Sequence, residues 1–169
     1  MDATELRAMQ APIKDRYKSD PGAALITLKA KGSLDDQSIA CKVETGRALA
    51  VAGLHPATGG SGLELCSGDM LLEALVACAG VTLKAVATAL DIDLRSGKVS
   101  AEGDLDFRGT LGVDKAAPVG FAQIRLRFDV DSDASQEKLD QLLRLTERYC
   151  VVYQTIKSGP PIDVKLVRE

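Results

Sequence analysis

A charge-free apolar stretch, ALVACAGVTL (Ala74–Leu83), restricts the possible folds of this 169-residue chain more than any other feature. It lies inside a longer segment, residues 68–90, that is apolar on nearly every face of a helix. We expect such a helix to be buried in a core or an interface. Glu73 and Lys84 limit the apolar run to about ten residues, whereas a membrane span needs about 20. The sequence therefore predicts no membrane partner.

The length and the charge of the chain narrow its class further. A chain of 169 residues is long enough for one domain with its own core. Its net charge is −3 and its Lys and Arg residues are scattered, so we expect no nucleic-acid partner. The N-terminus carries acidic residues and no apolar signal segment. We therefore expect a cytoplasmic protein.

The segments before the apolar helix have the patterns of a helix, three strands and a loop. An amphipathic helix is predicted over residues 4–18, although Pro12 lies inside it. Ser67 is expected to be the N-cap of the apolar helix, with Asp69 in its first turn. The three strands are predicted over residues 23–32, 37–46 and 47–53, and a long glycine-rich loop over residues 54–68.

The segments after the apolar helix alternate between strand and helix patterns. Residues 98–109 and 121–130 have the two-residue period of strands, with every second side chain expected to face the core. Asp133 and Gln136 have the spacing of a capping box for the helix that follows. A short helix beginning at Cys150 and a final strand over residues 160–167 complete the prediction.

The residues with the most reactive side chains are four cysteines and one histidine: Cys41, Cys66, Cys78, Cys150 and His55. Their spacing matches no CxxC or zinc-ligand pattern, which argues against a structural metal. The local pattern leaves two interpretations of Cys78 open, a small apolar core residue or a reactive thiol. Cys150 is predicted near a helix N-terminus, where unpaired N–H groups favour a thiolate.

Two of these neighbourhoods together resemble the OsmC/Ohr family of osmotically induced and organic hydroperoxide resistance proteins. They are SGDMLLEALVACAGVTLKAVA and, 72 residues after Cys78, ERYCVVYQTI. The resemblance covers roughly residues 37–169. It implies an α+β OsmC-like fold, with antiparallel sheets packed around long buried central helices in an intertwined homodimer. We expect one OsmC-like domain over residues 1–169, with a helical extension over 1–20 and a core over 22–169.

The resemblance also implies a thiol peroxidase that reduces organic hydroperoxides. In that mechanism Cys78 attacks the peroxide and becomes a sulfenic acid, and Cys150 condenses with it to form a disulfide. A dithiol reductant then restores both thiols. The resemblance implies no metal, haem, flavin or other cofactor.

Such a mechanism needs a cation that stabilises the Cys78 thiolate. In the family this is an Arg held by an acid at the start of the cysteine helix. Arg47 is nearest to the expected position, and Arg16 is a second candidate. Gly68 occupies the position of the family's acid, so Asp69 is the predicted substitute.

A further departure is that CVV replaces the family's Cys-Pro-Val at Cys150, which places the chain in a divergent branch. The alternative function is a non-catalytic OsmC-like protein that binds a hydrophobic small molecule or senses oxidants at the dimer interface. A third hypothesis is a structural protein whose apolar helix serves only dimerisation. Cys66 and His55 both lie near the start of that helix. Cys66 is either a third redox thiol or a spectator. His55 is either a residue of the site or an ordinary loop residue.

Overall fold

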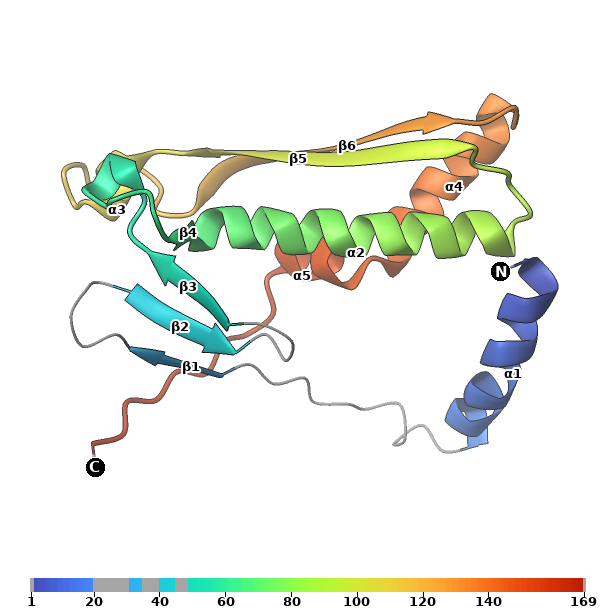
Figure 1. The fold of residues 1–169 in the computed structure, drawn as a ribbon, viewed down its shortest axis with the longest axis horizontal. Helices are drawn as coiled ribbons and strands as arrows, with labels where there is room; N and C mark the ends of the chain where they lie inside the picture. The colour runs from blue at the N-terminus through green and yellow to red at the C-terminus, as the bar shows by residue number, and fades with distance from the viewer. Residues whose placement is uncertain (1, 20–30, 35–39, 45–48, 169) are drawn as a thin grey trace.

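The helix α2 (Ser67–Ala89) is the axis around which the other elements are arranged (Figure 1). This computed structural model describes residues 2–19, 31–34, 40–44 and 49–168. Strand β5 contacts one side of α2, whereas α4 and α5 pack on another part of its surface. The remaining elements, in chain order, are α1 (Ala3–Ser19), β1 (Lys31–Leu34), β2 (Ala40–Glu44), β3 (Leu49–Gly53), the 3₁₀-helix η2 (Pro56–Thr58), β4 (Leu65–Cys66), β5 (Ser96–Leu105), α3 (Phe107–Thr110), β6 (Phe121–Asp131), α4 (Gln136–Tyr149) and α5 (Val151–Ser158).

The described strands form two separate sheets. In the first sheet β1, β2 and β3 are successive antiparallel strands, and the two-residue β4 pairs in parallel with β3. This confirms the second and third predicted strands where the structure describes them. Of the first, predicted over residues 23–32, residues 23–30 lie outside the described part, and β1 continues to Leu34, two residues beyond the predicted end. The second sheet is the long antiparallel hairpin of β5 and β6, which runs along α2 (Figure 1).

The core of the described chain lies at the C-terminal half of α2. Its buried members are Leu83 and Ala87 of α2, Ile92 after that helix and Leu142 of α4. Phe128 of β6 packs against this cluster from the hairpin. The two-residue period of β6 is confirmed, because its inward residues are partly buried and its charged residues are exposed. Hydrophobic burial thus stabilises the packing of both the hairpin and α4 against the central helix.

One side of α2 stays exposed among the residues that the structure describes. Val81, at the middle of the helix, is 73% exposed, and Leu71 is also exposed. Among the described helices, α2 is the one that has the length and apolar composition of a membrane span, and 28% of that stretch is buried in the structure. The core helix of a water-soluble protein meets the same criterion. The described residues thus bury one face of this helix, and burial of the other face in an interface stays a prediction.

Three predicted helix and strand boundaries were wrong. Helix α2 begins at Ser67 itself, so Cys66 is the N-cap and its side chain makes no capping bond. The N-cap of α4 is Ser135, whose hydroxyl accepts from the Lys138 amide, since Asp133 instead pairs with Arg95. The strand predicted over 98–109 stops at Leu105, because the Asp106 carboxylate accepts from the Arg108 amide and starts α3.

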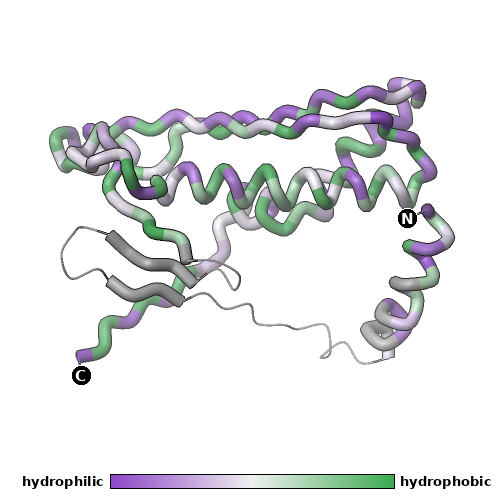
Figure 2. The backbone as a smooth tube through the Cα atoms, viewed as in Figure 1, coloured by the Kyte–Doolittle hydropathy of each residue, from purple (hydrophilic) through white to green (hydrophobic). Residues whose placement is uncertain are grey.

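The final strand predicted over residues 160–167 is also absent from the described chain. These residues follow α5 as an exposed segment without regular structure (Figure 1). Its apolar and polar residues alternate, as the strand prediction required (Figure 2). No described strand pairs with it, and a strand exists only when its backbone has a partner.

Candidate functional site

The site is centred on Cys78, which lies halfway along α2, and on Cys150, which lies where α4 ends and α5 begins. The backbone of Cys150 is extended, with φ −73° and ψ 107°, so the chain breaks for a single residue between the two helices. Its N–H still donates to the Thr146 carbonyl of α4 at 2.9 Å, and its carbonyl accepts from the Gln154 amide of α5 at 3.0 Å. Cys150 is therefore the C-cap of α4 and the N-cap of α5.

A side-chain bond holds this break in place. The Gln154 side-chain amide of α5 donates to the Glu147 carbonyl of α4 at 2.8 Å, and the bond is partly buried. Cys150 itself is only 1% exposed. The break therefore aims the first amides of α5 in one fixed direction, toward α2, which α5 contacts.

Groups of α5 and of its own helix shift the pKa of Cys78. Burial raises the pKa of Cys78, but this is outweighed by donation from the Val152 amide, the Cys150 thiol, the Thr82 hydroxyl and the Val151 amide. The net pKa of Cys78 lies below the ordinary thiol range. Unpaired amides at a helix N-terminus stabilise negative charge, and here that charge is the Cys78 thiolate.

Cys150 is shifted in the opposite direction. Burial raises its pKa most, its bond to Cys78 and the charge there raise it further, and the amides of Tyr153 and Val152 oppose this only in part. The α5 amides thus favour a Cys150 thiolate, as the helix N-terminus predicts, but burial and the neighbouring Cys78 outweigh them. Of the two cysteines, Cys78 is therefore the one whose thiolate is favoured.

The other predicted site residues lie elsewhere or outside the described chain. Asp69 is in the first turn of α2, nine residues before Cys78, or about 13 Å along the helix axis. Arg47 lies outside the described residues, and Arg16 belongs to α1. The predicted activation of Cys78 by a cation held by Asp69 stays a prediction. Cys41 belongs to β2.

Asp69 instead shares a small cavity of about 380 Å³ with Cys66 and His55. The His55 Nδ1 atom accepts from the Ala57 amide at 3.0 Å, and its ring stacks on Phe107 with centroids 4.9 Å apart. These contacts give His55 a structural role, fixing the loop before α2 against the end of the hairpin.

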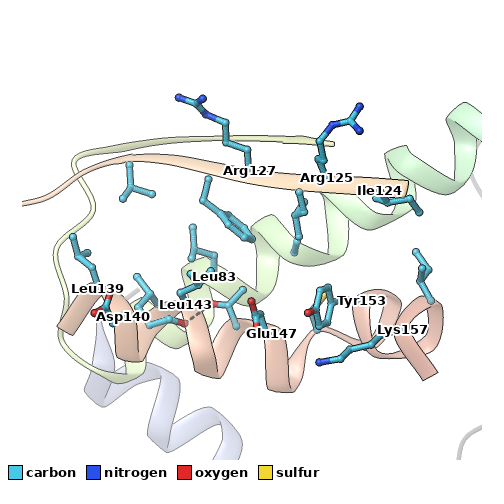
Figure 3. Close-up of a pocket in the computed structure, with 18 of the residues that line it drawn as sticks. Leu83, Ile124, Arg125, Arg127, Leu139, Asp140, Leu143, Glu147, Tyr153 and Lys157 are labelled. Carbon is cyan, nitrogen blue, oxygen red and sulfur yellow. Dashed lines mark hydrogen bonds between the residues drawn. The ribbon is translucent and has the colours of Figure 1, made fainter. Parts of the chain in front are cut away.

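A larger cavity of about 850 Å³ lies between β6 and the helices α4 and α5, with Cys150 in its wall (Figure 3). The side chains of Arg125 and Arg127 point away from it, while Tyr153 and Lys157 lie on its helical side (Figure 3). Its lining is mostly apolar: Ala79, Leu83, Ile124, Leu126, Phe128, Val130, Leu139, Leu142, Leu143 and Ile156. The space beside the thiol pair therefore suits a hydrophobic molecule.

Within the described ranges, no group of three or more His, Cys, Asp and Glu side chains is placed to hold a metal ion. The chemistry that the described site offers is that of its two sulfurs. Cys66 is a free thiol at the N-terminal end of α2, away from Cys78 at the middle of that helix.

The structure is an α+β chain built on a long apolar helix with a cysteine at its middle, and a second cysteine lies at the break between two helices that pack on it. These features define a class of two-cysteine proteins. The sequence model described as OsmC-like protein matches residues 60–165, and the chain therefore belongs to the OsmC-like family. No curated protein matches the chain.

Solved structures support the same fold. An OsmC-like protein from Mycoplasma pneumoniae superposes with a TM-score of 0.65 at 16% identity, covering 79% of this chain and 89% of that one. An organic hydroperoxide resistance protein OsmC from Legionella pneumophila gives 0.61 at 18% identity, covering 80% and 92%. The organic hydroperoxide resistance protein OhrB of Bacillus subtilis gives 0.52 at 17% identity, covering 79% and 93%. At these identities the similarity establishes the fold alone.

Proposed function

We propose that this protein is a homodimeric thiol peroxidase that reduces organic hydroperoxides through a Cys78 sulfenic acid and a Cys78–Cys150 disulfide. The observation that carries the proposal is the placement of Cys150, which is buried at the junction of α4 and α5, the two helices that pack on the helix of Cys78. The pKa shifts of the two cysteines agree with it, because the pKa of Cys78 is lowered and that of Cys150 is raised. A thiolate is the nucleophilic form of cysteine, and a lowered pKa favours it at Cys78. Membership of the OsmC-like family is consistent with this activity.

The reaction has three steps. The Cys78 thiolate attacks the terminal peroxide oxygen, the O–O bond breaks, and the leaving alkoxide takes up a proton to give an alcohol and a Cys78 sulfenic acid. Cys150 then attacks the sulfenic sulfur, releasing water and forming the disulfide. A dithiol reductant in the cytoplasm, the proposed location, returns both cysteines to thiols. These steps call on no metal or organic cofactor.

The opposed pKa shifts support this order of steps. While Cys78 is a thiolate, its charge helps to raise the pKa of Cys150, which favours protonated Cys150. Oxidation of Cys78 removes that charge and its contribution, whereas burial, the largest cause of the raised pKa of Cys150, remains.

The homodimer is proposed because one chain leaves too much apolar surface uncovered. Val81 on α2 and Ile162, Val164 and Leu166 in the C-terminal segment are all largely exposed. Surface of this kind is normally buried in an interface. Glu73 and Lys84 interrupt the apolar side of α2, so a second copy fits this surface better than a membrane does.

A second candidate function is the binding of a hydrophobic small molecule or the sensing of oxidants without turnover. The observation that favours it is the cavity of about 850 Å³ beside Cys150, whose lining is mostly apolar. In this case Cys150 lines a binding site, and neither cysteine is consumed by peroxide.

The two functions are separated by counting thiols after brief treatment with stoichiometric cumene hydroperoxide, followed by peptide mapping. The peroxidase predicts the loss of two thiols and a Cys78–Cys150 peptide. In a Cys150→Ser variant it predicts a sulfenic acid trapped at Cys78. The matched control is Cys66→Ser, which removes a free cysteine outside the pair and should leave the reaction unchanged. Survival of all four thiols would reject the peroxidase and favour binding.

A further inference from the structure

The cavity of about 850 Å³ lies on a different side of α2 from Cys78. Ala79 and Leu83, which are one helical turn apart, line the cavity, whereas Cys78 does not. Among the described cysteines, Cys150 is the one in its wall. Cys78 is instead one turn from Val81, which lies on the exposed side of α2. A molecule in this cavity would therefore contact Cys150 and leave Cys78 uncovered.

The shape of the cavity fits a chain-like apolar molecule. Its wall on the strand side consists of successive inward residues of β6: Ile124, Leu126, Phe128 and Val130. The residue steps along this wall extend about 20 Å in total, at about 3.3 Å each. Mostly apolar side chains of α4 and α5 form the opposite wall (Figure 3). The volume of about 850 Å³ is in the range of small-molecule sites.

One carboxylate in the cavity wall lacks a protein partner. Among the residues that the structure describes, the Glu147 carboxylate makes no hydrogen bond and no ion pair. The Asp140 carboxylate, by contrast, accepts from the Gln136 side-chain amide at 2.8 Å. Arg125 and Arg127 point away from the cavity and pair with acidic residues of the hairpin (Figure 3). Glu147 is therefore the acidic group of this wall that is open to a ligand.

The surroundings of Glu147 suit a positively charged group. The Gln154 side-chain amide donates to the Glu147 carbonyl at 2.8 Å, which fixes the backbone of this half-buried residue. The Tyr153 ring lies on the same, helical side of the cavity (Figure 3). Aromatic faces attract ammonium groups, and the Lys157 ammonium already lies 5.5 Å from the centre of this ring. A carboxylate and an aromatic ring together are groups that recognise an amine.

We propose that this cavity binds an elongated hydrophobic amine, with its apolar chain along β6 and its ammonium group at Glu147. The inference goes beyond the proposed peroxidase, because such a ligand binds whether or not Cys78 reacts with peroxide. It names the chemical class of the ligand in the second candidate function. A second copy of the chain is the competing occupant, and it would leave no room for the amine.

Isothermal titration calorimetry of the full chain with monomeric dodecylamine tests this site. Dodecylamine should bind once per chain and about tenfold more tightly than dodecanoic acid, which has an equally long chain and the opposite charge. Glu147→Gln should raise the Kd for dodecylamine by about tenfold, the equivalent of one charge-assisted hydrogen bond. The same variant should bind dodecanol as the unmodified protein does, which shows that its cavity is intact.

Glu137→Gln is the matched control, because Glu137 lies on the same helix, is exposed and does not line the cavity. It should leave the Kd for dodecylamine unchanged. The inference would be overturned by the absence of saturable amine binding, by equal binding of the amine and the acid, or by an equal effect of the two glutamine variants. Amine binding by a protein that does not react with cumene hydroperoxide would reject the proposed peroxidase alone.

Discussion

Deletion of the C-terminal segment should separate the proposed homodimer into monomers. A chain that ends after Gly159 loses Ile162, Val164 and Leu166, which are 83%, 83% and 100% exposed in the single chain. They alternate with Asp163 and Lys165, so in an extended segment the apolar side chains share one face. We expect this segment to add to a sheet of the second copy, which would bury that face and pair its backbone.

The size of the effect follows from these three side chains. Full burial of a Val, Leu or Ile side chain contributes about 2 kcal/mol, so the three together contribute about 6 kcal/mol for each segment. Ordering a flexible segment on binding costs about 3 kcal/mol, which leaves about 3 kcal/mol for each segment. Because both chains of a two-fold dimer lose the segment, about 6 kcal/mol is lost, and the dissociation constant should rise by about 10⁴-fold on deletion.

Sedimentation equilibrium over a range of protein concentrations measures this change directly. The point variant Leu166→Asp should weaken the dimer in the same direction. The control is Asp163→Ala with Lys165→Ala, which removes an exposed ion pair of 3.6 Å from the polar face and should have little effect. A deleted chain that dimerises as tightly as the full chain would show that other surfaces hold the two copies together.

Three further predictions concern the core and the thiol pair. Leu142→Ala should destabilise the fold by about 2–5 kcal/mol in urea unfolding, since Leu142 is 2% exposed, whereas the half-exposed Leu143→Ala should cost much less; equal losses would contradict the described core. Cys78 should alkylate at pH values above its lowered pKa and lose reactivity as the pH falls through it; Cys150→Ala should move that loss to higher pH, and Cys150→Ser, which keeps a donor, should not. Val151→Pro removes one amide donor at the first position of α5. It should shift the pH profile of Cys78 alkylation in the same direction as Cys150→Ala but by less. An unchanged pH profile would exclude that amide from the site.

The regular elements could be predicted from periodicity because their burial is periodic. Residues 121–130 alternate, and β6 buries Ile124, Leu126 and Phe128 in part while exposing the residues between them. The errors arose where competing side chains decide a boundary. Asp133 and Ser135 are both good N-caps, and the ion pair of Asp133 with Arg95 decided between them. The segment 160–167 has a strand pattern, but a pattern does not supply the partner that a strand needs.

The site was predicted less completely than the fold. The resemblance singled out Cys78 and Cys150, and in the structure the helices α4 and α5 that meet at Cys150 both contact the helix of Cys78. The sequence indicates the helix N-terminus whose amides lower the pKa of Cys150, but not the burial that outweighs them, because burial depends on tertiary packing.

The replacement of proline by valine after Cys150 gains a physical meaning from this geometry. A proline at the first position of a helix has no N–H, so it could not donate to a neighbouring sulfur. In this chain Val151 occupies that position, and its amide is one of the donors to Cys78. Valine does not enforce the helix break as proline would, and the bond from Gln154 to the Glu147 carbonyl spans the break instead. Val151 in place of proline thus gives up a rigid residue and gains a backbone N–H donor. An additional donor is expected at a site that stabilises a thiolate.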